Sequence, residues 1–283
     1  MASIFDPGTT NRLLNSITNN QQSLRTRLAQ VASGNRLVTA SVDAAGLAIS
    51  EALRSDITAL NQVVRNIDSG ANFIRVAEGG LATVSDLLVR GRELAIQSAN
   101  GTLGPQEREA LNQEFSQILS EIDRISATQE FNGQPILDGS LAPGSATPVT
   151  IQAGIGSGPE NQISLNVIDA VNTQSLGIAG ENILDPQNAL QAFDRLGQAQ
   201  AQVAEVRGQV GAISNRLEIT ARNTRNTIVN LEASRSEIAG TDVARSISDL
   251  NQNLLRVESS IRALALQIRQ NESNVGRILN INT

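Results

Sequence analysis

A regular apolar stripe near the C-terminal end of the chain limits what the chain can fold into. From residue 243 to residue 268, apolar side chains recur at alternating steps of four and three. The positions are Val243, Ile247, Leu250, Leu254, Val257, Ile261, Leu264 and Ile268. This is the heptad spacing of a coiled-coil seam, in which the stripe lies against a partner. Little chain follows, so a distant segment or another molecule has to cover the stripe.

The beginning of the chain carries a similar stripe, between about residues 10 and 33. Its seam positions include Leu14, Ile17, Leu24, Leu28 and Val31, and Gly34 follows as a helix-ending residue. The simplest arrangement therefore packs the two terminal helices on each other. Each has one narrow seam without an aromatic anchor, so we expect the pair to be marginal alone and to gain order from neighbouring subunits. A generic helical bundle is the alternative explanation.

The middle of the chain predicts more helix and one β region. Helical spacing covers about 44 to 99, 106 to 128 and the segment from Pro186 to about 239. Residues 129 to 185 are rich in Pro and Gly, and "VTIQAGI" and "QISLNVI" alternate around the turn "GSGPEN", which predicts a β-hairpin. The predicted fold class is therefore mainly α: a long antiparallel helical rod or coiled-coil bundle with a small β-hairpin region and paired terminal helices.

Composition weighs against several classes of function. The chain has no Cys, His, Trp, Tyr or Lys, so acid–base chemistry would fall to Asp and Glu, and an enzyme is not expected. No cofactor, metal or catalytic residue is indicated. The net charge of −6, with Arg and acids interspersed, disfavours nucleic acid as a partner. No run of 18 apolar residues is present, so no membrane insertion is expected.

Several long motifs, in order, resemble bacterial flagellin. They are "ASGNRLVTASVDAAGLAISEALRSDI" (32–57), "NIDSGANFIRVAEGGLATVSDLLVRGRELAIQSANGTL" (66–103), "EFNGQPILDG" (130–139) and "GAISNRLEITARNTRNTIVNLEASRSEIAGTDVA" (211–244). The resemblance covers both ends and most of the helical portion. The middle is short, so the chain is similar to a flagellin that keeps only the two core layers of the filament.

The resemblance implies a structural subunit that polymerises with copies of itself into a helical filament for motility. It further implies export unfolded through the flagellar type III export apparatus, with an export chaperone, and contacts with the filament cap and hook-junction proteins. The location implied is the extracellular flagellar filament, with a periplasmic flagellum as the alternative. The opening residues show neither the charged leader nor the apolar block of a secretory signal peptide, which agrees with this route.

Two domains are expected from this reading. Residues 1–40 and 241–283 would form the inner, filament-core domain from the paired terminal helices. Residues 41–240 would form an outer rod, including the hairpin insert at 129–185. The apolar seam positions listed above are the predicted assembly surface.

One helical segment resembles the region of flagellin that is read by the flagellin-sensing Toll-like receptor. The residues that match are Arg90 and Leu94, in "LVRGRELAIQSANGT", and Glu114, in "LNQEFSQ". The alternative is an ordinary solvated helix face with intrahelical ion pairs.

Two other functions stay open from the sequence. The hook–filament junction protein shares both terminal regions, although "DAAGLAI" and "EFNGQPILDG" favour flagellin. A filament-associated metal-dependent hydrolase would have to use acids in the 129–185 insert, which is too short for a separate active-site domain. The glycines of "GIGSGP" are spaced as in a phosphate loop, but a strand follows them instead of a helix, which favours a hairpin turn.

Overall fold

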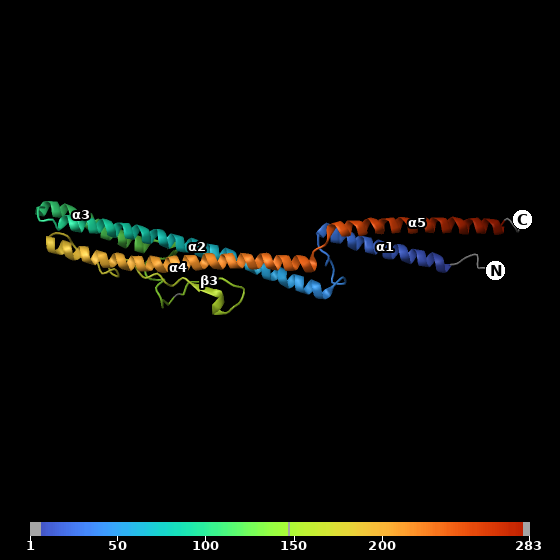
Figure 1. The fold of residues 1–283 in the computed structure, drawn as a ribbon, viewed down its shortest axis with the longest axis horizontal. Helices are drawn as coiled ribbons and strands as arrows, with labels where there is room; N and C mark the ends of the chain where they lie inside the picture. The colour runs from blue at the N-terminus through green and yellow to red at the C-terminus, as the bar shows by residue number, and fades with distance from the viewer. Residues whose placement is uncertain (1–6, 147, 280–283) are drawn as a thin grey trace. The chain divides into compact units, whose positions relative to one another are not determined.

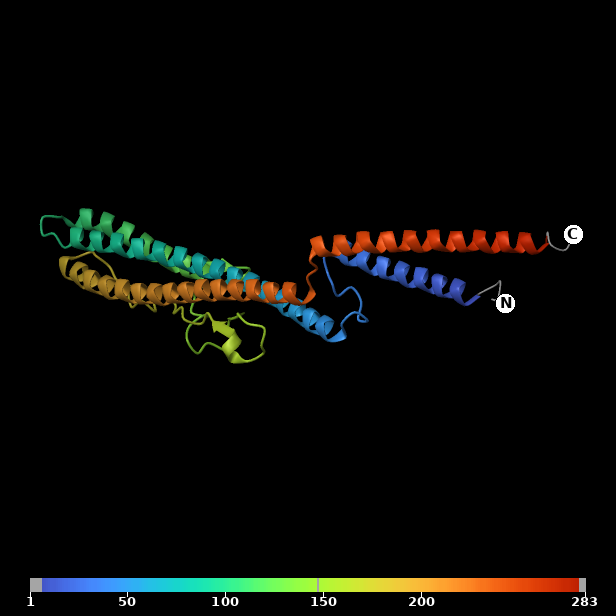
Figure 2. The same ribbon diagram turned by 45° about the vertical axis from the view of Figure 1, so that its right-hand side comes forward.

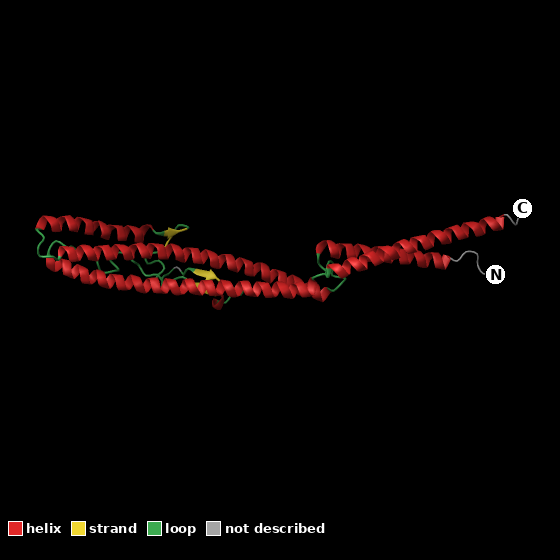
Figure 3. Cartoon of the chain, turned by 45° about the horizontal axis from the view of Figure 1, so that its top comes forward, coloured by secondary structure: helices red, strands yellow, loops and turns green. Residues whose placement is uncertain are grey.

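The computed structural model describes residues 7–146 and 148–279, and most of them are helical (Figure 3). The helices are α1 (Pro7–Ser33), α2 (Ala44–Ser98), α3 (Pro105–Thr128), α4 (Pro186–Ala239) and α5 (Val243–Leu279). The predicted mainly α class is confirmed. The predicted ends of the first four helices lie within three residues of the observed ends. Residues 1–6 and 280–283 of the predicted inner domain lie outside the described residues.

The chain divides into two compact units. The terminal unit comprises residues 1–55 and 230–283, and the central unit comprises residues 56–229. The division falls inside α2 and α4, so each of these helices contributes to both units. The boundaries expected from the sequence, at 40/41 and 240/241, lie instead in the short connections between helices.

The central unit is built on three helices and the insert that follows α3. In this unit α2, α3 and α4 run side by side (Figure 1), and one continuous apolar core joins them to residues of the insert. Fully buried members include Leu88 of α2, Phe115 of α3, Val203 of α4 and Leu141 of the insert. Aliphatic side chains therefore supply most of this core, as a chain with five Phe and no other aromatic residue requires.

The insert contains two short β-hairpins. Strand β3 (Thr150–Gln152) pairs antiparallel with β4 (Gln162–Ser164), with Ile151 opposite Ile163, and the short 3-10 helix η1 (Pro159–Asn161) precedes β4. The predicted hairpin is confirmed, with shorter strands than the alternating pattern suggested. The second hairpin joins β1 (Glu130–Phe131) to β2 (Gln134–Pro135).

The β1–β2 hairpin was not predicted, although its turn carries a clear signal. Asn132 and Gly133 both have positive φ, 52° and 78°. This is the backbone of a tight hairpin turn, for which Asn-Gly is the preferred pair. The turn could therefore have been recognised within "EFNGQPILDG" from physical reasoning alone.

Polar side chains of α3 hold the insert in place. The Asp123 carboxylate accepts hydrogen bonds from the Thr173 backbone N–H at 2.8 Å and from the Thr173 hydroxyl at 2.9 Å. The Ser126 hydroxyl donates to the Leu137 carbonyl at 2.8 Å, and the Asn112 side-chain oxygen accepts from the Ile183 N–H at 2.9 Å. These bonds satisfy backbone N–H and C=O groups of the insert, whose short strands form few hydrogen bonds with each other.

The motif "DAAG" has a structural explanation at the start of α2. The Asp43 carboxylate caps the helix by accepting a hydrogen bond from the Gly46 N–H at 2.8 Å. A Cβ on Gly46 would lie 2.4 Å from Asp43 Oδ2 and 3.3 Å from Leu37 Cδ1. Glycine at this position thus leaves room for both the capping carboxylate and the buried Leu37 side chain.

The adjacent glycines 79 and 80 of α2 differ in their surroundings. A Cβ on Gly80 would lie 2.7 Å from Leu137 Cδ1 and 3.3 Å from Gln129 Cγ, whereas a Cβ on Gly79 would meet no atom within 4 Å. Gly80 therefore permits close approach of the insert to the helix. Gly79 has no such role.

This difference predicts opposite effects of two neighbouring substitutions. Gly79→Ala should stabilise the chain by about 1 kcal/mol, because alanine is the better helix former and the site is open. Gly80→Ala should destabilise it by about 1–3 kcal/mol, because the added methyl group overpacks the contact with Leu137. Urea unfolding of the central unit, followed by circular dichroism, measures both. Equal effects at the two positions would contradict the close contact.

Candidate assembly surface

The terminal unit brings the two ends of the chain together. Helices α1 and α5 lie side by side in this unit (Figures 1 and 2), as the paired-seam hypothesis expected. Gly34 ends α1 with a φ of +66°, and the connections next to both helices pair with each other. The Arg36 N–H donates to the Ala239 carbonyl at 2.7 Å, and the Thr241 N–H donates to the Gly34 carbonyl at 3.2 Å.

A buried glutamine and an arginine reinforce this junction. Gln30 is 4 % exposed, and its side-chain amide donates to the Arg36 carbonyl at 2.8 Å. The Arg36 guanidinium in turn donates to the Ile238 carbonyl at 2.8 Å. Side-chain hydrogen bonds thus fix the point from which α1 and α5 run alongside each other.

The apolar seams of α1 and α5 are only half covered. The partly buried positions are Ile17, Leu24, Val31, Leu250, Val257 and Leu264. The alternate positions are 45 to 49 % exposed: Leu14, Leu28, Val243, Ile247, Leu254, Ile261 and Ile268. No apolar side chain described in α1 or α5 is fully buried. Each seam therefore has one row of positions against the partner helix and one row that a single chain leaves open to solvent.

Helix α5 also exposes apolar side chains away from its seam. Leu255 and Leu266 are 65 % and 64 % exposed. They line a shallow groove of about 470 Å³ with Glu258 and Arg262. The sequence pattern of the seam did not single out these two leucines, because they fall outside the heptad positions. They enlarge the apolar surface that one chain presents on α5.

Two polar contacts that join α1 to α5 are long. Arg27 lies 3.7 Å from Asp249, and the Gln267 amide is 3.5 Å from the Thr10 hydroxyl. Contacts of this length contribute little to stability. Apolar contact along the seam is therefore the principal interaction between the two helices.

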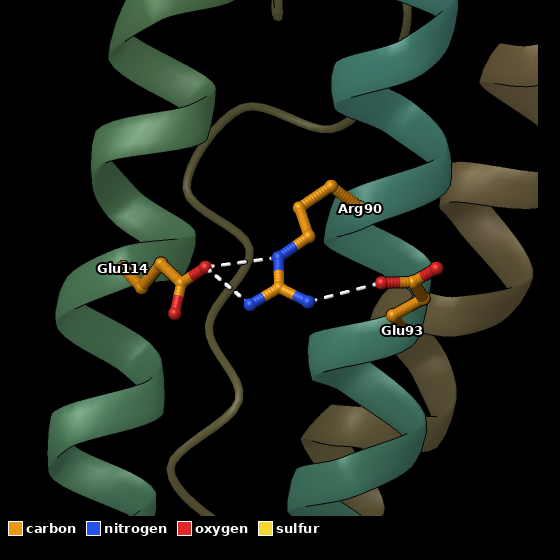
Figure 4. Close-up of polar contacts among 3 residues, drawn as sticks. All are labelled: Arg90, Glu93 and Glu114. Atoms are coloured by element: carbon orange, nitrogen blue, oxygen red, sulfur yellow. Dashed lines mark hydrogen bonds and ion pairs between the residues drawn. The ribbon is translucent and has the colours of Figure 1, made fainter.

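A separate polar cluster lies in the central unit, where Arg90 of α2 meets Glu114 of α3 (Figure 4). Arg90 Nε and Nη2 donate to Glu114 Oε1 at 2.9 and 2.7 Å, and Nη1 donates to Glu93 at 3.0 Å. The hydrogen bond to Glu114, followed by that to Glu93, raises the pKa of the Arg90 guanidinium above its ordinary value. About half of each side chain is exposed, so this cluster is available at the surface.

Leu94 does not share that surface. The structure brings Arg90 and Glu114 together, but Leu94 has no exposed area and belongs to the apolar core. It faces the core because α2 packs this side of its helix against other elements of the central unit. Of these three residues, Arg90 and Glu114 are therefore accessible at the surface, while Leu94 supports α2 from inside.

No group of three or more acidic side chains that could hold a metal ion occurs in the described part of the chain. No helix among the residues described is long and apolar enough to cross a membrane.

Comparison with known proteins decides the family. Residues 8–142 match the bacterial flagellin N-terminal helical region, and residues 193–279 match the bacterial flagellin C-terminal helical region. The chain belongs to the bacterial flagellin family. It is 36 % identical over 254 residues to the flagellar filament 30.7 kDa core protein of Treponema maltophilum, covering 87 % of this chain and 89 % of that protein. It is 37 % identical to flagellin of Halalkalibacterium halodurans, covering 89 % of this chain and 90 % of the relative.

A solved structure supports the fold. A putative flagellar hook-associated protein from Vibrio parahaemolyticus aligns with a TM-score of 0.58 at 16 % identity, covering 70 % of this chain and 100 % of that structure. At this identity the likeness concerns the fold alone. Family membership makes this flagellin a structural subunit of the bacterial flagellar filament, not an enzyme, and flagellins associate with one another to form that filament.

Proposed function

We propose that α1 and α5 form the inner layer of a helical homopolymer and that other copies cover the open row of seam residues. The half-exposed seam positions carry this proposal, because an apolar row of this regularity is unfavourable in water. The proposed inner layer comprises residues 1–40 and 241–283, and the outer layer comprises residues 41–240. The fully buried core of the central unit supports its role as a rod that is complete in the monomer.

The energy of assembly would come from many modest apolar contacts. Fully burying a Leu or Ile side chain contributes roughly 1.5–3 kcal/mol before the entropy cost of association is counted. Seven seam residues are about half exposed in one chain, so several neighbours per subunit could each cover part of the row. A polymer would then be stable although the α1–α5 pair alone is marginal.

The seam proposal predicts loss of assembly without loss of the central fold. Leu254→Asp and Ile261→Asp place a carboxylate in the open row and should abolish filament formation, because each would bury an unpaired charge. The helical signal of the central unit should persist, since both positions lie in the terminal unit. Negative-stain microscopy and sedimentation of the purified chain measure assembly, and circular dichroism measures folding.

Gln252→Asp is the matched control. Gln252 is exposed on α5, two residues from both Leu250 and Leu254, and therefore lies on the other face of the helix. The control adds the same charge outside the seam and should still polymerise. Filaments formed normally by Leu254→Asp would overturn the seam assignment, and unfolding of the central unit would show that the two units are not independent.

We further propose the export and assembly partners implied by the family. These are the flagellar type III export apparatus, an export chaperone, the filament cap and the hook-junction proteins. The marginal pairing of α1 and α5 supports transport in an unfolded form, because little native structure has to be lost at the chain ends. The absence of Cys in the sequence agrees with a route that needs no disulfide chemistry.

Recognition by the flagellin-sensing Toll-like receptor is a second proposal, supported by the exposed Arg90–Glu114 pair. Arg90→Ala and Glu114→Ala should each weaken receptor activation, because either change removes a charged group that is accessible in the monomer. Leu94→Ala should act indirectly, by destabilising the central unit by about 2–5 kcal/mol through a core cavity. A receptor-reporter assay on monomer, combined with urea unfolding, separates these effects.

The control for this prediction uses another exposed ion pair of α3. Arg124 lies 2.5 Å from Glu121, and both side chains are substantially exposed. Arg124→Ala should leave receptor activation unchanged. Equal losses for Arg90→Ala and Arg124→Ala would show that the assay reports general surface charge.

A further inference from the structure

Charge is distributed unevenly between the two units. The terminal helices α1 and α5 carry eight arginines, three in α1 and five in α5, against three carboxylates, all in α5. Residues 56–229 carry nineteen acids against eleven arginines, a net charge of −8. The helix pair is therefore net positive by five in a chain whose total charge is −6.

Part of this positive charge gathers around one cleft of the terminal unit. The cleft has a volume of about 820 Å³ and is lined from α1, from the connection to α2 and from α5. One arginine comes from each of these segments: Arg27, Arg36 and Arg256. Uncharged amides such as Asn19 and Asn253 add further donors, and no carboxylate is among the described lining residues.

The three guanidinium groups keep unused hydrogen-bonding capacity. Arg27 makes two long contacts, 3.4 Å to the Gln30 side-chain oxygen and 3.7 Å to Asp249. Arg36 donates from one nitrogen to the Ile238 carbonyl. The Arg256 side chain makes no hydrogen bond or ion pair with the described residues. Each guanidinium has five N–H donors, so most donors of the cleft face solvent or lack a strong acceptor.

We propose that this cleft binds carboxylate side chains from a second copy of the chain. The planar fork of arginine matches the two oxygens of a carboxylate, which gives the strongest class of charged hydrogen bond. A water molecule takes about 30 Å³ of liquid, so the cleft has room for whole side chains. The proposal rests on the proposed polymer, in which net-positive helix pairs of neighbouring copies come together and need anionic groups between them.

The acidic surface of the chain supplies suitable partners. The net charge of −8 in residues 56–229 makes a second copy electrostatically complementary to the terminal helix pair. The contact would add specificity and register to the non-directional apolar seam. Inorganic sulfate presents oxygens of the same kind and can compete for the cleft, which makes it a useful probe.

The test measures the critical concentration for filament assembly of the full-length chain at fixed ionic strength. Arg27→Gln and Arg256→Gln should each raise it roughly tenfold, the effect of losing one charged hydrogen bond. Arg256→Lys should recover part of the loss, because it keeps the charge without the fork. The matched control is Arg262→Gln, on the same helix, where the arginine pairs with Glu258 of its own chain. It should change the critical concentration by less than about twofold, as expected for an exposed pair.

The effect of sulfate on assembly is a second measurement, because it compares two salts as well as two proteins. Replacing chloride by sulfate at constant ionic strength strengthens apolar burial in every variant alike. Sulfate competes with the carboxylates of a second copy only in proteins that keep Arg27 and Arg256. Sulfate should therefore favour assembly less in the native chain than in the Arg27→Gln/Arg256→Gln double variant. The same sulfate effect in both proteins would contradict the proposal.

The outcomes separate this proposal from the proposed function. If the native chain and Arg262→Gln form no filaments, the polymer assignment itself fails. If they form filaments and the cleft variants do so at the same critical concentration, only the carboxylate-binding cleft is overturned. Thermal melting of each monomer by circular dichroism checks that the substitutions leave the helices intact.

Discussion

Apolar contact between α1 and α5 is the interaction on which the behaviour of the terminal unit depends. It is incomplete in one chain: one row of seam positions is partly buried, and the alternate row remains about half exposed. The Arg27–Asp249 and Gln267–Thr10 contacts between the two helices are long, so they cannot replace the missing apolar contact. Two helices that meet along one narrow seam do not enclose a core by themselves.

The central unit differs from the terminal unit because it has a third helix and an insert that share its apolar core. Leu88, Phe115 and Val203 of its three helices are fully buried, in one apolar core that also includes residues of the insert after α3. Side chains of α3 such as Asp123 hold that insert through its backbone. In the proposed polymer, the chain thus joins a unit that completes its own core to a unit whose open seam is covered by other copies. This division suits a subunit that has to remain monomeric before assembly and become fixed afterwards.

Periodicity in the sequence predicted the helices well, because heptad spacing and the capping residues are local properties. Gly34 and Pro186 marked helix ends that the structure confirms. The β3–β4 hairpin followed from alternation, while the β1–β2 hairpin was missed although Asn132-Gly133 signals its turn. The boundary between the compact units was not predictable, because it falls inside continuous helices where no local signal changes.

The candidate sites were predictable only in part. Spacing placed the seam residues on one stripe, but it could not say which row would face the partner helix and which would stay open. Family resemblance singled out Arg90, Leu94 and Glu114, but it indicated neither the Arg90–Glu114 ion pair nor the burial of Leu94, because both depend on how α2 packs. The arginine cleft depends on residues from three segments, and no sequence motif connects them.

Amide hydrogen exchange, measured on monomer and on filament, tests the central claim most directly. We expect fast exchange throughout residues 7–33 and 243–279 in the monomer, because a half-covered helix pair opens easily, and strong protection of the same residues in the filament. Core segments around Leu88 and Val203 should be protected in both states. Protection of the terminal helices in the monomer as strong as that of the central core would contradict the account.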